Sequence, residues 1–233
     1  MNKIWSAKKS DVSLVKKLAK DLNVSEIISQ LLVQRGIKNF DEAKLFFRPK
    51  ISDLNDPFLM KNMDVAVKRI ESAISRKERV LIYGDYDVDG TTSVAMMYSF
   101  LKKYITDLEY YIPCRYNEGY GISLKGIDYA QKKNISLIIA LDCGTRAVKQ
   151  INYANKIGID FIICDHHIPS DKIPSAIALL NPKQADCYYP YKELSGCGVG
   201  FKLLQAYCLN NKISFDKIKQ YLDLLAVSIS ADL

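Results

Sequence analysis

The stretch RVLIYGDYDVDGTT, residues 79–92, joins a short apolar run to three aspartates at alternate positions. Residues 80–83 are apolar, β-branched and aromatic, which is typical of a buried strand. Asp85, Asp87 and Asp89 follow, and a glycine closes the series. Carboxylates at this density repel one another unless a cation lies among them, so the stretch predicts a cation site at the end of a strand.

The pattern D-x-D-x-D-G also begins the calcium-binding loop of an EF-hand. That loop needs a bidentate glutamate as its twelfth residue, and counted from Asp85 the twelfth residue is Met96. It also needs a preceding helix, whereas residues 80–83 have the pattern of a strand. The sequence therefore excludes an EF-hand site, and the cation requires another explanation.

The composition is that of a soluble globular protein, with 25% charged and 48% hydrophobic residues. A chain of 233 residues can hold one large domain or a domain with an appendage. The formal net charge is +7, and the surface away from the acidic site is more basic than this figure. Such a surface suits a polyanionic substrate, and a lysine-rich solubilised surface explains the charge equally well.

Cysteine usage and the N-terminal residues indicate the compartment. The six cysteines form no C-x-x-C pair, so zinc-ribbon and thioredoxin-type sites have no support. The first residues contain no apolar run that could act as a signal peptide, and no stretch approaches the length of a membrane span. We expect a reducing, cytoplasmic location and no membrane partner.

Two kinds of pattern divide the chain. Residues 11–47 show helical periodicity, and the polar segment 48–58 contains two prolines, as expected for a linker. We expect a helical lead and linker over 1–62 and an α/β core over 63–233. In the core, short apolar runs alternate with amphipathic helices, which predicts an open, mostly parallel sheet with helices on both faces. The predicted strands are 79–84, 108–113, 136–144, 160–167 and 176–183.

Polar residues recur where these strands end. The run before Asp142 is apolar, as is the run before Asp165, His166 and His167, and Asn181 ends the last strand. In an open parallel sheet, ligands bind beyond the carboxyl ends of the strands. Separate strands therefore deliver carboxylates and imidazoles to one edge of one sheet.

The only two histidines of the chain are adjacent. A lone histidine near a strand end is more often a structural hydrogen-bonding residue than a ligand. Two histidines beside Asp165, at an edge that gathers four other acids, favour a metal site. Because neighbours in an extended segment point to opposite sides, we expect only one to coordinate directly. The other would orient a ligand, act as an acid or contact a phosphate.

The donor set indicates the metal. Several aspartates with an imidazole and no thiolate favour Mn²⁺ or Mg²⁺ over structural zinc. Two cations about 3.5–4 Å apart, bridged by an aspartate, would balance the carboxylates. Asp142 suits the bridge because it stands alone at the end of a central strand. For Asp85 an N-cap role before the next helix is the alternative.

The stretches GDYDVDGTTS, ALDCGT and CDHH resemble the successive motifs of the DHH phosphoesterase superfamily. Within it, IPCRYNEGYGIS (residues 112–123) and LSGCGVGFKLL (residues 194–204) are similar to motifs of its exonucleases specific for single-stranded DNA. The resemblance extends over essentially the whole chain. It implies a 5′→3′ exonuclease that uses two Mn²⁺ or Mg²⁺ ions, releases 5′ mononucleotides and acts in DNA repair and recombination.

The same resemblance implies roles for particular residues. In AVSISADL (residues 226–233), Ser228 and Ser230 replace an expected glycine and threonine. The implied catalytic residues are His167, Asp142 and Asp165, and the implied metal ligands are Asp85, Asp87, Asp89, Asp142, His166 and Asp232.

A further set is expected to contact nucleic acid. Arg115 would hold a phosphate, with an ion pair to Glu118 as the alternative. The tyrosines could stack on bases, with ordinary packing inside the protein as the alternative. The glycines could let backbone N–H groups approach a phosphate, with tight helix packing as the alternative. The set comprises Arg115, Tyr116, Asn117, Tyr120, Gly196 and Gly198.

Members of the superfamily branch continue past the last aspartate, so we expect this chain to form the metal site without degrading long strands processively. Single-stranded DNA is the expected substrate, with a helicase or a single-strand-binding protein as candidate partner. Two other functions stay open. One is a phosphodiesterase of short oligonucleotides or cyclic dinucleotides, and the other is a non-catalytic nucleic-acid-binding module.

Overall fold

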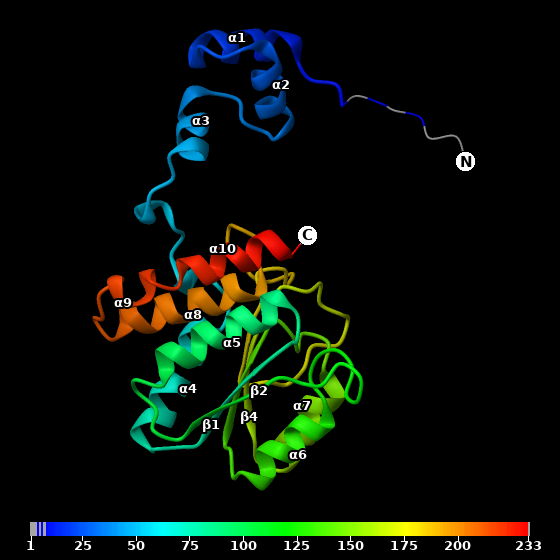
Figure 1. Cartoon of the computed structure of the whole chain (residues 1–233), viewed down its shortest axis with the longest axis vertical. Coiled ribbons are helices and arrows are strands. Elements are labelled where there is room, and N and C mark those ends of the chain that lie inside the picture. The colour runs from blue at the N-terminus through cyan, green and yellow to red at the C-terminus, as the bar shows by residue number, and fades with distance from the viewer. Residues whose placement is uncertain (1–3, 5, 7, 233) are drawn as a thin grey trace. The chain divides into compact units, whose positions relative to one another are not determined.

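The computed structural model describes residues 4, 6 and 8–232 of the chain. They form two compact units, Met1–Leu54 and Asn55–Leu233. The boundary lies within the proline-containing segment 48–58. Figure 1 labels the α-helices of both units and the strands β1, β2 and β4.

The N-terminal unit is helical. Its helices are α1 (Val12–Leu22), α2 (Glu26–Gln34) and α3 (Phe40–Phe47). Each helix has a side-chain cap that satisfies free N–H groups of its first turn. These caps are Asp11, Ser25 and Asn39. A small core joins the helices through Leu18, Leu32, Ile37 and Ala43.

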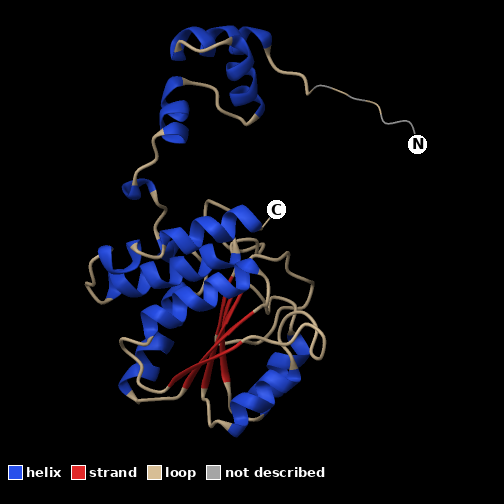
Figure 2. Cartoon of the chain, in the orientation of Figure 1, coloured by secondary structure: helices blue, strands red, loops and turns tan. Residues whose placement is uncertain are grey.

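The second unit is built on a parallel sheet, which in the described residues has five strands in the order β2-β1-β3-β4-β5. The predicted α/β fold with a parallel sheet is confirmed. Figure 2 shows the strands between helices of the same unit. The strands are β1 (Val80–Gly84), β2 (Leu108–Tyr111), β3 (Leu137–Leu141), β4 (Asp160–Cys164) and β5 (Ala178–Leu180).

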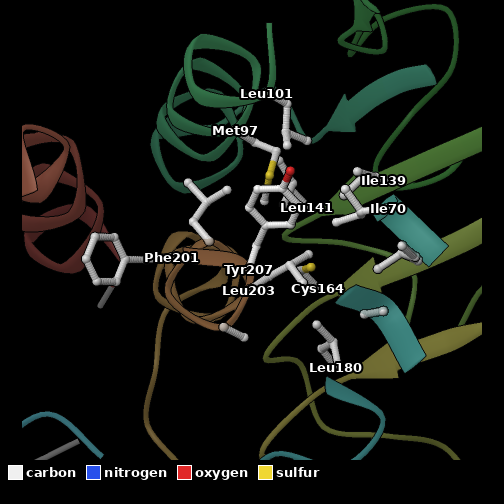
Figure 3. Packing of buried hydrophobic residues seen from close by; sticks show 14 of the residues in the cluster. Ile70, Met97, Leu101, Ile139, Leu141, Cys164, Leu180, Phe201, Leu203 and Tyr207 are labelled. Atoms are coloured by element: carbon white, nitrogen blue, oxygen red, sulfur yellow. The ribbon is translucent and has the colours of Figure 1, made fainter. Parts of the chain in front are cut away.

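Helices cover both faces of the sheet, because alternate residues of every central strand are apolar on both sides. Ile82, Ile139 and Ile162 belong to one core cluster, shared with α4 (Met63–Ser75), α5 (Val88–Leu101) and α8 (Gly196–Asn210). Figure 3 shows part of this cluster, in which Leu203 and Tyr207 of α8 lie near Leu141 and Cys164. The neighbouring residues Leu81, Ile138 and Phe161 join the opposite cluster, shared with α6 (Leu124–Lys132) and α7 (Val148–Lys156).

The last helices close one side of the second unit. The short α9 (Asp216–Lys219) is followed by α10 (Leu222–Ala231), which packs on α5 and α8, as Figure 1 shows. Two single turns of 3₁₀ helix, Ile51–Asp53 and Pro57–Leu59, precede α4. Among the described helices, none has the length and apolar character needed to span a membrane.

Candidate metal centre

The carboxyl ends of three adjacent strands meet at one edge of the sheet. The chain passes from β1 to β2 on one side and on to β3 on the other, so the strand order reverses between β1 and β3, where open α/β sheets bind ligands. Asp85 follows β1, Asp142 follows β3 and Asp165 follows β4. All three residues are at most 1% exposed. The predicted convergence of strand ends is therefore present in the structure.

His166 lies at the centre of the gathered acids. Its Nε2 is 3.2 Å from Asp142 Oδ1 and 3.7 Å from Asp89 Oδ2. Its Nδ1 is 3.5 Å from Asp232 Oδ2, which comes from the end of α10. Two sets of donors could each hold a cation, because their ligand atoms lie within 4.8 Å of one another. They are Asp142 with His166 and His167, and Asp89 with His166 and Asp232.

Two buried carboxylate oxygens make this edge suitable for a cation. Within the described part of the chain, Asp85 Oδ2 and Asp142 Oδ1 accept no hydrogen bond. His166 Nε2 is close to the second of these atoms without the geometry of a hydrogen bond. Burial, followed by the charges of Asp89 and Asp87, raises the pKa of Asp142 to about 10. Unpaired buried carboxylates are costly, and hard divalent cations such as Mn²⁺ and Mg²⁺ are their usual partners, so these residues fit such ions.

The backbone at Asp142 is unusual for this residue type. Its φ is +59°, in the left-handed region that few non-glycine residues occupy. The Asp142 N–H donates to the Cys164 carbonyl oxygen at 2.8 Å, which holds the strand end in place. The N-terminus of α8 also approaches closely, since a Cβ on Gly196 would lie 2.5 Å from the Asp142 Cβ. Strain of this kind is frequent at functional sites and is maintained by the surrounding structure.

Asp89 is held by the N-terminus of α8. Its carboxylate accepts the N–H groups of Gly196 and Cys197 at 2.6 and 2.7 Å, and the Ser228 hydroxyl at 2.7 Å. The Gly198 N–H donates to Ser195 Oγ. The N–H groups of Gly196 and Gly198 are thus already satisfied inside the protein, which corrects the prediction that they approach a phosphate.

The remaining aspartates of the first motif have different roles. Asp87 is the N-cap of α5, because its Oδ1 accepts the Gly90 N–H at 2.9 Å, and it is exposed. Asp85 does not cap that helix, and its Oδ1 instead accepts the Tyr86 N–H. Burial raises the pKa of Asp85. In residues 8–232, neither Asp85 nor Asp87 joins the two donor sets centred on His166.

Asp165 orients His167. Its Oδ1 lies 2.7 Å from His167 Nδ1, and its Oδ2 accepts the Thr145 N–H at 2.8 Å. Burial alone would raise the pKa of Asp165, but the hydrogen bond and charge of His167 and the hydrogen bonds from Thr145 together outweigh burial and lower the pKa to about 2. The same hydrogen bond raises the pKa of His167. Asp165 is therefore a positioning residue, with both oxygens engaged by the protein.

The two imidazoles face the same region, with ring centroids 4.7 Å apart. The prediction that they point to opposite sides is wrong because β4 ends at Cys164, so the alternation of an extended strand no longer applies. Asp165 Oδ1 also accepts the N–H groups of His166 and His167, which curls the segment into a turn. Both histidines are close enough to Asp142 to share one cation with it.

Asn181 and Ser228 are parts of the site that residue patterns did not assign. Asn181 Nδ2 donates to Thr145 Oγ1 and to the His167 carbonyl oxygen, so it joins the loops after β3 and β4. Its position at a strand end was the available signal. Ser228 stood out only as a departure from the family pattern, and its hydroxyl bonds Asp89 across 139 residues of sequence.

The loop after β2 carries the predicted nucleic-acid contacts. The Arg115 guanidinium lies over the Tyr86 ring, 5.4 Å from its centroid. Glu118 does not pair with Arg115, because its carboxylate accepts the hydroxyls of Tyr111 and Ser123 and the Cys114 N–H. The alternative interpretation of Arg115 is therefore wrong.

The other residues of this loop are also exposed. Tyr116 is 94% exposed, and Asn117 lies beside it on the surface. The Tyr120 hydroxyl lies 2.9 Å from His167 Nε2, and its ring packs edge-on against Tyr86. Tyr120 therefore links the loop to the catalytic candidate His167, whereas Tyr116 is exposed to solution and the Asn117 amide donates to Cys114 Sγ at 3.6 Å.

A family model described as "DHH family, N-terminal domain" matches residues 79–229. The chain belongs to the DHH family. The match covers the five described strands and the loops that carry both histidines and the acids of the site other than Asp232.

More particular similarities are to proteins named RecJ. The chain is 41% identical over 229 residues to the single-stranded-DNA-specific exonuclease RecJ of Bacillus subtilis (strain 168), covering 98% of this chain and 28% of that protein. It is 28% identical over 216 residues to the protein of the same name from Escherichia coli (strain K12), covering 88% of this chain and 37% of that protein. The chain thus spans about a third of the length of these relatives.

Solved structures agree with these similarities. A crystal structure of exonuclease RecJ bound to manganese superposes with a TM-score of 0.68 and 28% identity, covering 75% of this chain and 44% of that one. RecJ of Thermus thermophilus in complex with Mn²⁺ has the same fold, with a TM-score of 0.75 at 23% identity, over 95% of this chain and 31% of that one.

Proposed function

We propose that this chain is the metal-binding part of an exonuclease that hydrolyses phosphodiester bonds of single-stranded DNA in the 5′→3′ direction and releases 5′ mononucleotides. The observation that carries the proposal is the pair of unpartnered buried oxygens, Asp85 Oδ2 and Asp142 Oδ1, beside donor sets that share His166 in the described chain. The names of the relatives support the substrate, and manganese in a related structure supports Mn²⁺ or Mg²⁺ as the cofactor.

Asp142, His166, Asp89 and Asp232 would hold two cations, with His166 common to both donor sets. Asp85 and Asp87, from the same edge of the sheet, would be further ligands. Divalent cations held there supply Lewis-acid stabilisation of the charge that develops on phosphoryl oxygens.

His167 is the protein's own group for contact with the reacting phosphate. Asp165 fixes the ring through Nδ1, so Nε2 points at the Tyr120 hydroxyl, where a substrate oxygen can replace or join it. The hydrogen bond to Asp165 is the chief cause that raises the pKa of His167. A protonated Nε2 donates a hydrogen bond to an oxygen of the phosphate and can pass a proton to the leaving group.

The loop after β2 would hold the strand. Arg115 is positioned by the Tyr86 ring and has no carboxylate within ion-pair distance in the described residues, so its fork of N–H donors is available to a phosphate. Tyr116 offers an exposed ring for stacking on a base, and Asn117 a side-chain amide beside it. The proposal includes DNA repair and recombination in the cytoplasm, with a helicase or a single-strand-binding protein as partner.

The test is a single-turnover assay with a 5′-labelled single strand, with Mn²⁺ and with EDTA. We expect a labelled mononucleotide as first product only with Mn²⁺, and none from Asp142→Ala. Asp171→Ala is the matched control, because Asp171 is an exposed loop acid close in sequence to Asp165. Intact strand despite bound Mn²⁺, or faster cleavage of a cyclic dinucleotide, would contradict the proposal.

A further inference from the structure

A cavity of about 260 Å³ opens beside the Asp165–His167 pair, on the side of α7. Its walls include Tyr120, Ile122, Cys143, Arg146, Gln150 and His167. His167 and Tyr120 thus face both the candidate metal centre and this cavity. Arg146 and Gln150 belong to no motif discussed above and have no role in the proposed chemistry.

The lining combines an apolar wall with cationic and amide groups. Ile122 and Cys143 are buried and apolar, whereas Arg146 is exposed at the surface. Among the described residues that line the cavity, Asp165 is the one acid. Its two oxygens are engaged by His167 and by the Thr145 N–H. The cavity therefore favours a ligand that is anionic at one end and apolar at the other.

Arg146 is held in place. Its Nε donates to the Ile168 carbonyl oxygen at 2.8 Å, in the residue directly after His167. Across residues 8–232, no carboxylate lies within ion-pair distance of its guanidinium. Since only Nε is engaged, the terminal N–H groups can bind two oxygens of one phosphate.

The loops that carry Arg146 and His167 are tied together. Asn181 Nδ2 donates to Thr145 Oγ1 and to the His167 carbonyl oxygen, and the bond from Arg146 to Ile168 adds a third link. The guanidinium and the imidazole therefore keep a fixed relation before any ligand arrives, and a ligand that needs both does not have to order them.

We propose that this cavity is a subsite for one nucleotide unit, with the phosphate on Arg146 and the sugar and base against Tyr120 and Ile122. Its volume is below the roughly 300–1,000 Å³ of pockets for drug-sized ligands, which limits it to about one unit. The Gln150 amide can donate to or accept from a base edge. The inference rests on the proposed function in one respect, namely that the substrate is a DNA strand. It places the nucleotide next to the scissile phosphate in the cavity, on the α7 side of His167.

The test measures binding of 2′-deoxyadenosine 5′-monophosphate by calorimetry in EDTA, where no turnover occurs. We expect Arg146→Ala to weaken binding about tenfold or more, the effect of losing charge-assisted hydrogen bonds, and Arg146→Lys to fall between. Lys149→Ala is the matched control, because Lys149 is an exposed cation of α7 outside the cavity lining and should leave the affinity unchanged. Deoxyadenosine without its phosphate should bind at least tenfold more weakly than the monophosphate.

Equal affinities of Arg146→Ala and the unchanged chain, or equal binding of nucleoside and nucleotide, would overturn the subsite. So would a chain that does not bind the monophosphate at all. Because the assay needs neither metal nor cleavage, failure of the nuclease assay leaves its result intact, and the two proposals can fail separately.

Discussion

The tips of β3 and β4 lie side by side and each ends in a buried aspartate, yet their hydrogen bonding is opposite. Asp142 and Asp165 are both 1% exposed. At the β4 tip, Asp165 binds His167 and Thr145 with its two oxygens. At the β3 tip, Asp142 Oδ1 accepts no hydrogen bond from any described residue. One tip is complete as folded, and the other is complete only with a cation.

This difference separates two functions within a few residues. The β4 tip forms a rigid frame that orients His167 and joins neighbouring loops. The β3 tip, with Asp85 beside it at the end of β1, keeps unpaired carboxyl oxygens for a ligand. Leaving these oxygens buried without a partner is costly in the metal-free protein, and a bound cation would satisfy them.

The largest expected effect is from breaking the complete tip. Asp165→Asn replaces the buried carboxylate by a neutral amide. The hydrogen bonds that this carboxylate makes with the Thr145 N–H and with His167 Nδ1 are then weakened. We expect the free energy of unfolding in EDTA to fall by about 3 kcal/mol. Urea unfolding followed by circular dichroism measures it. Asp171→Asn, an exposed acid nearby, should change it by less than about 0.5 kcal/mol.

The second prediction concerns the incomplete tip. At a Mn²⁺ concentration about 100 times the dissociation constant, the chain should gain about 2.7 kcal/mol of stability. Asp142→Asn should abolish this gain and leave the metal-free protein about as stable as before, because the raised pKa of Asp142 keeps its carboxyl neutral without a cation and the amide is neutral too. Thermal unfolding with and without Mn²⁺ checks both statements. A destabilised metal-free variant would show that Asp142 resembles Asp165 after all.

The third prediction concerns the support of Asp89. Ser228→Ala removes the hydroxyl that donates to Asp89 Oδ1, so a buried charged acceptor loses one of its hydrogen bonds. We expect a loss of about 1.5–2 kcal/mol in the free energy of unfolding. Ser230→Ala is the control, since its hydroxyl bonds only a carbonyl of its own helix on the exposed face. Equal losses of the free energy of unfolding in the two variants would show that the Ser228 hydroxyl does not stabilise Asp89.

Per pH unit, the smallest expected effect is a pH dependence. The pKa of Asp142 is raised by burial and by Asp89 and Asp87, so the folded state binds a proton that the unfolded state releases. Its contribution to stability is present below about pH 4 and is lost as pH rises towards about 10. In EDTA, stability should therefore decline between about pH 5 and 9, by less than about 1.4 kcal/mol per pH unit.

His167 contributes a decline of the same sign, because its pKa is also raised. The difference in slope between the unchanged chain and Asp142→Asn measures the titration of Asp142 together with the effect of its charge on His167. Identical slopes would mean that Asp142 stays ionised without a metal.

Much of this architecture follows from local sequence patterns. Runs such as residues 80–83 are short and apolar throughout, so they predict buried parallel strands, and polar residues at their ends predict a shared edge. That logic placed Asp85, Asp142 and Asp165 together, because the carboxyl ends of parallel strands all lie at the same edge.

Contacts between distant parts of the sequence were beyond such patterns. The α8 amides reach Asp89 across 107 and 108 residues, and nothing near GCGVG (residues 196–200) indicates a protein carboxylate rather than a phosphate. The prediction that the two histidines point to opposite sides failed for a local reason. β4 ends at Cys164 and Asp165 then forms a turn, so the alternation of an extended strand does not reach His166 and His167. Arg146 was not predicted as a site residue because a single arginine outside any motif does not indicate a function by itself.

The central claim is that the edge where β1 and β3 end binds divalent cations through Asp142 and His166. The most direct measurement is anomalous diffraction at the manganese edge from crystals of the chain grown with Mn²⁺. We predict anomalous peaks in contact with Asp142 Oδ1 and a nitrogen of His166. Crystals that contain Mn²⁺ only at surface carboxylates, with Asp142 and His166 unliganded, would contradict it.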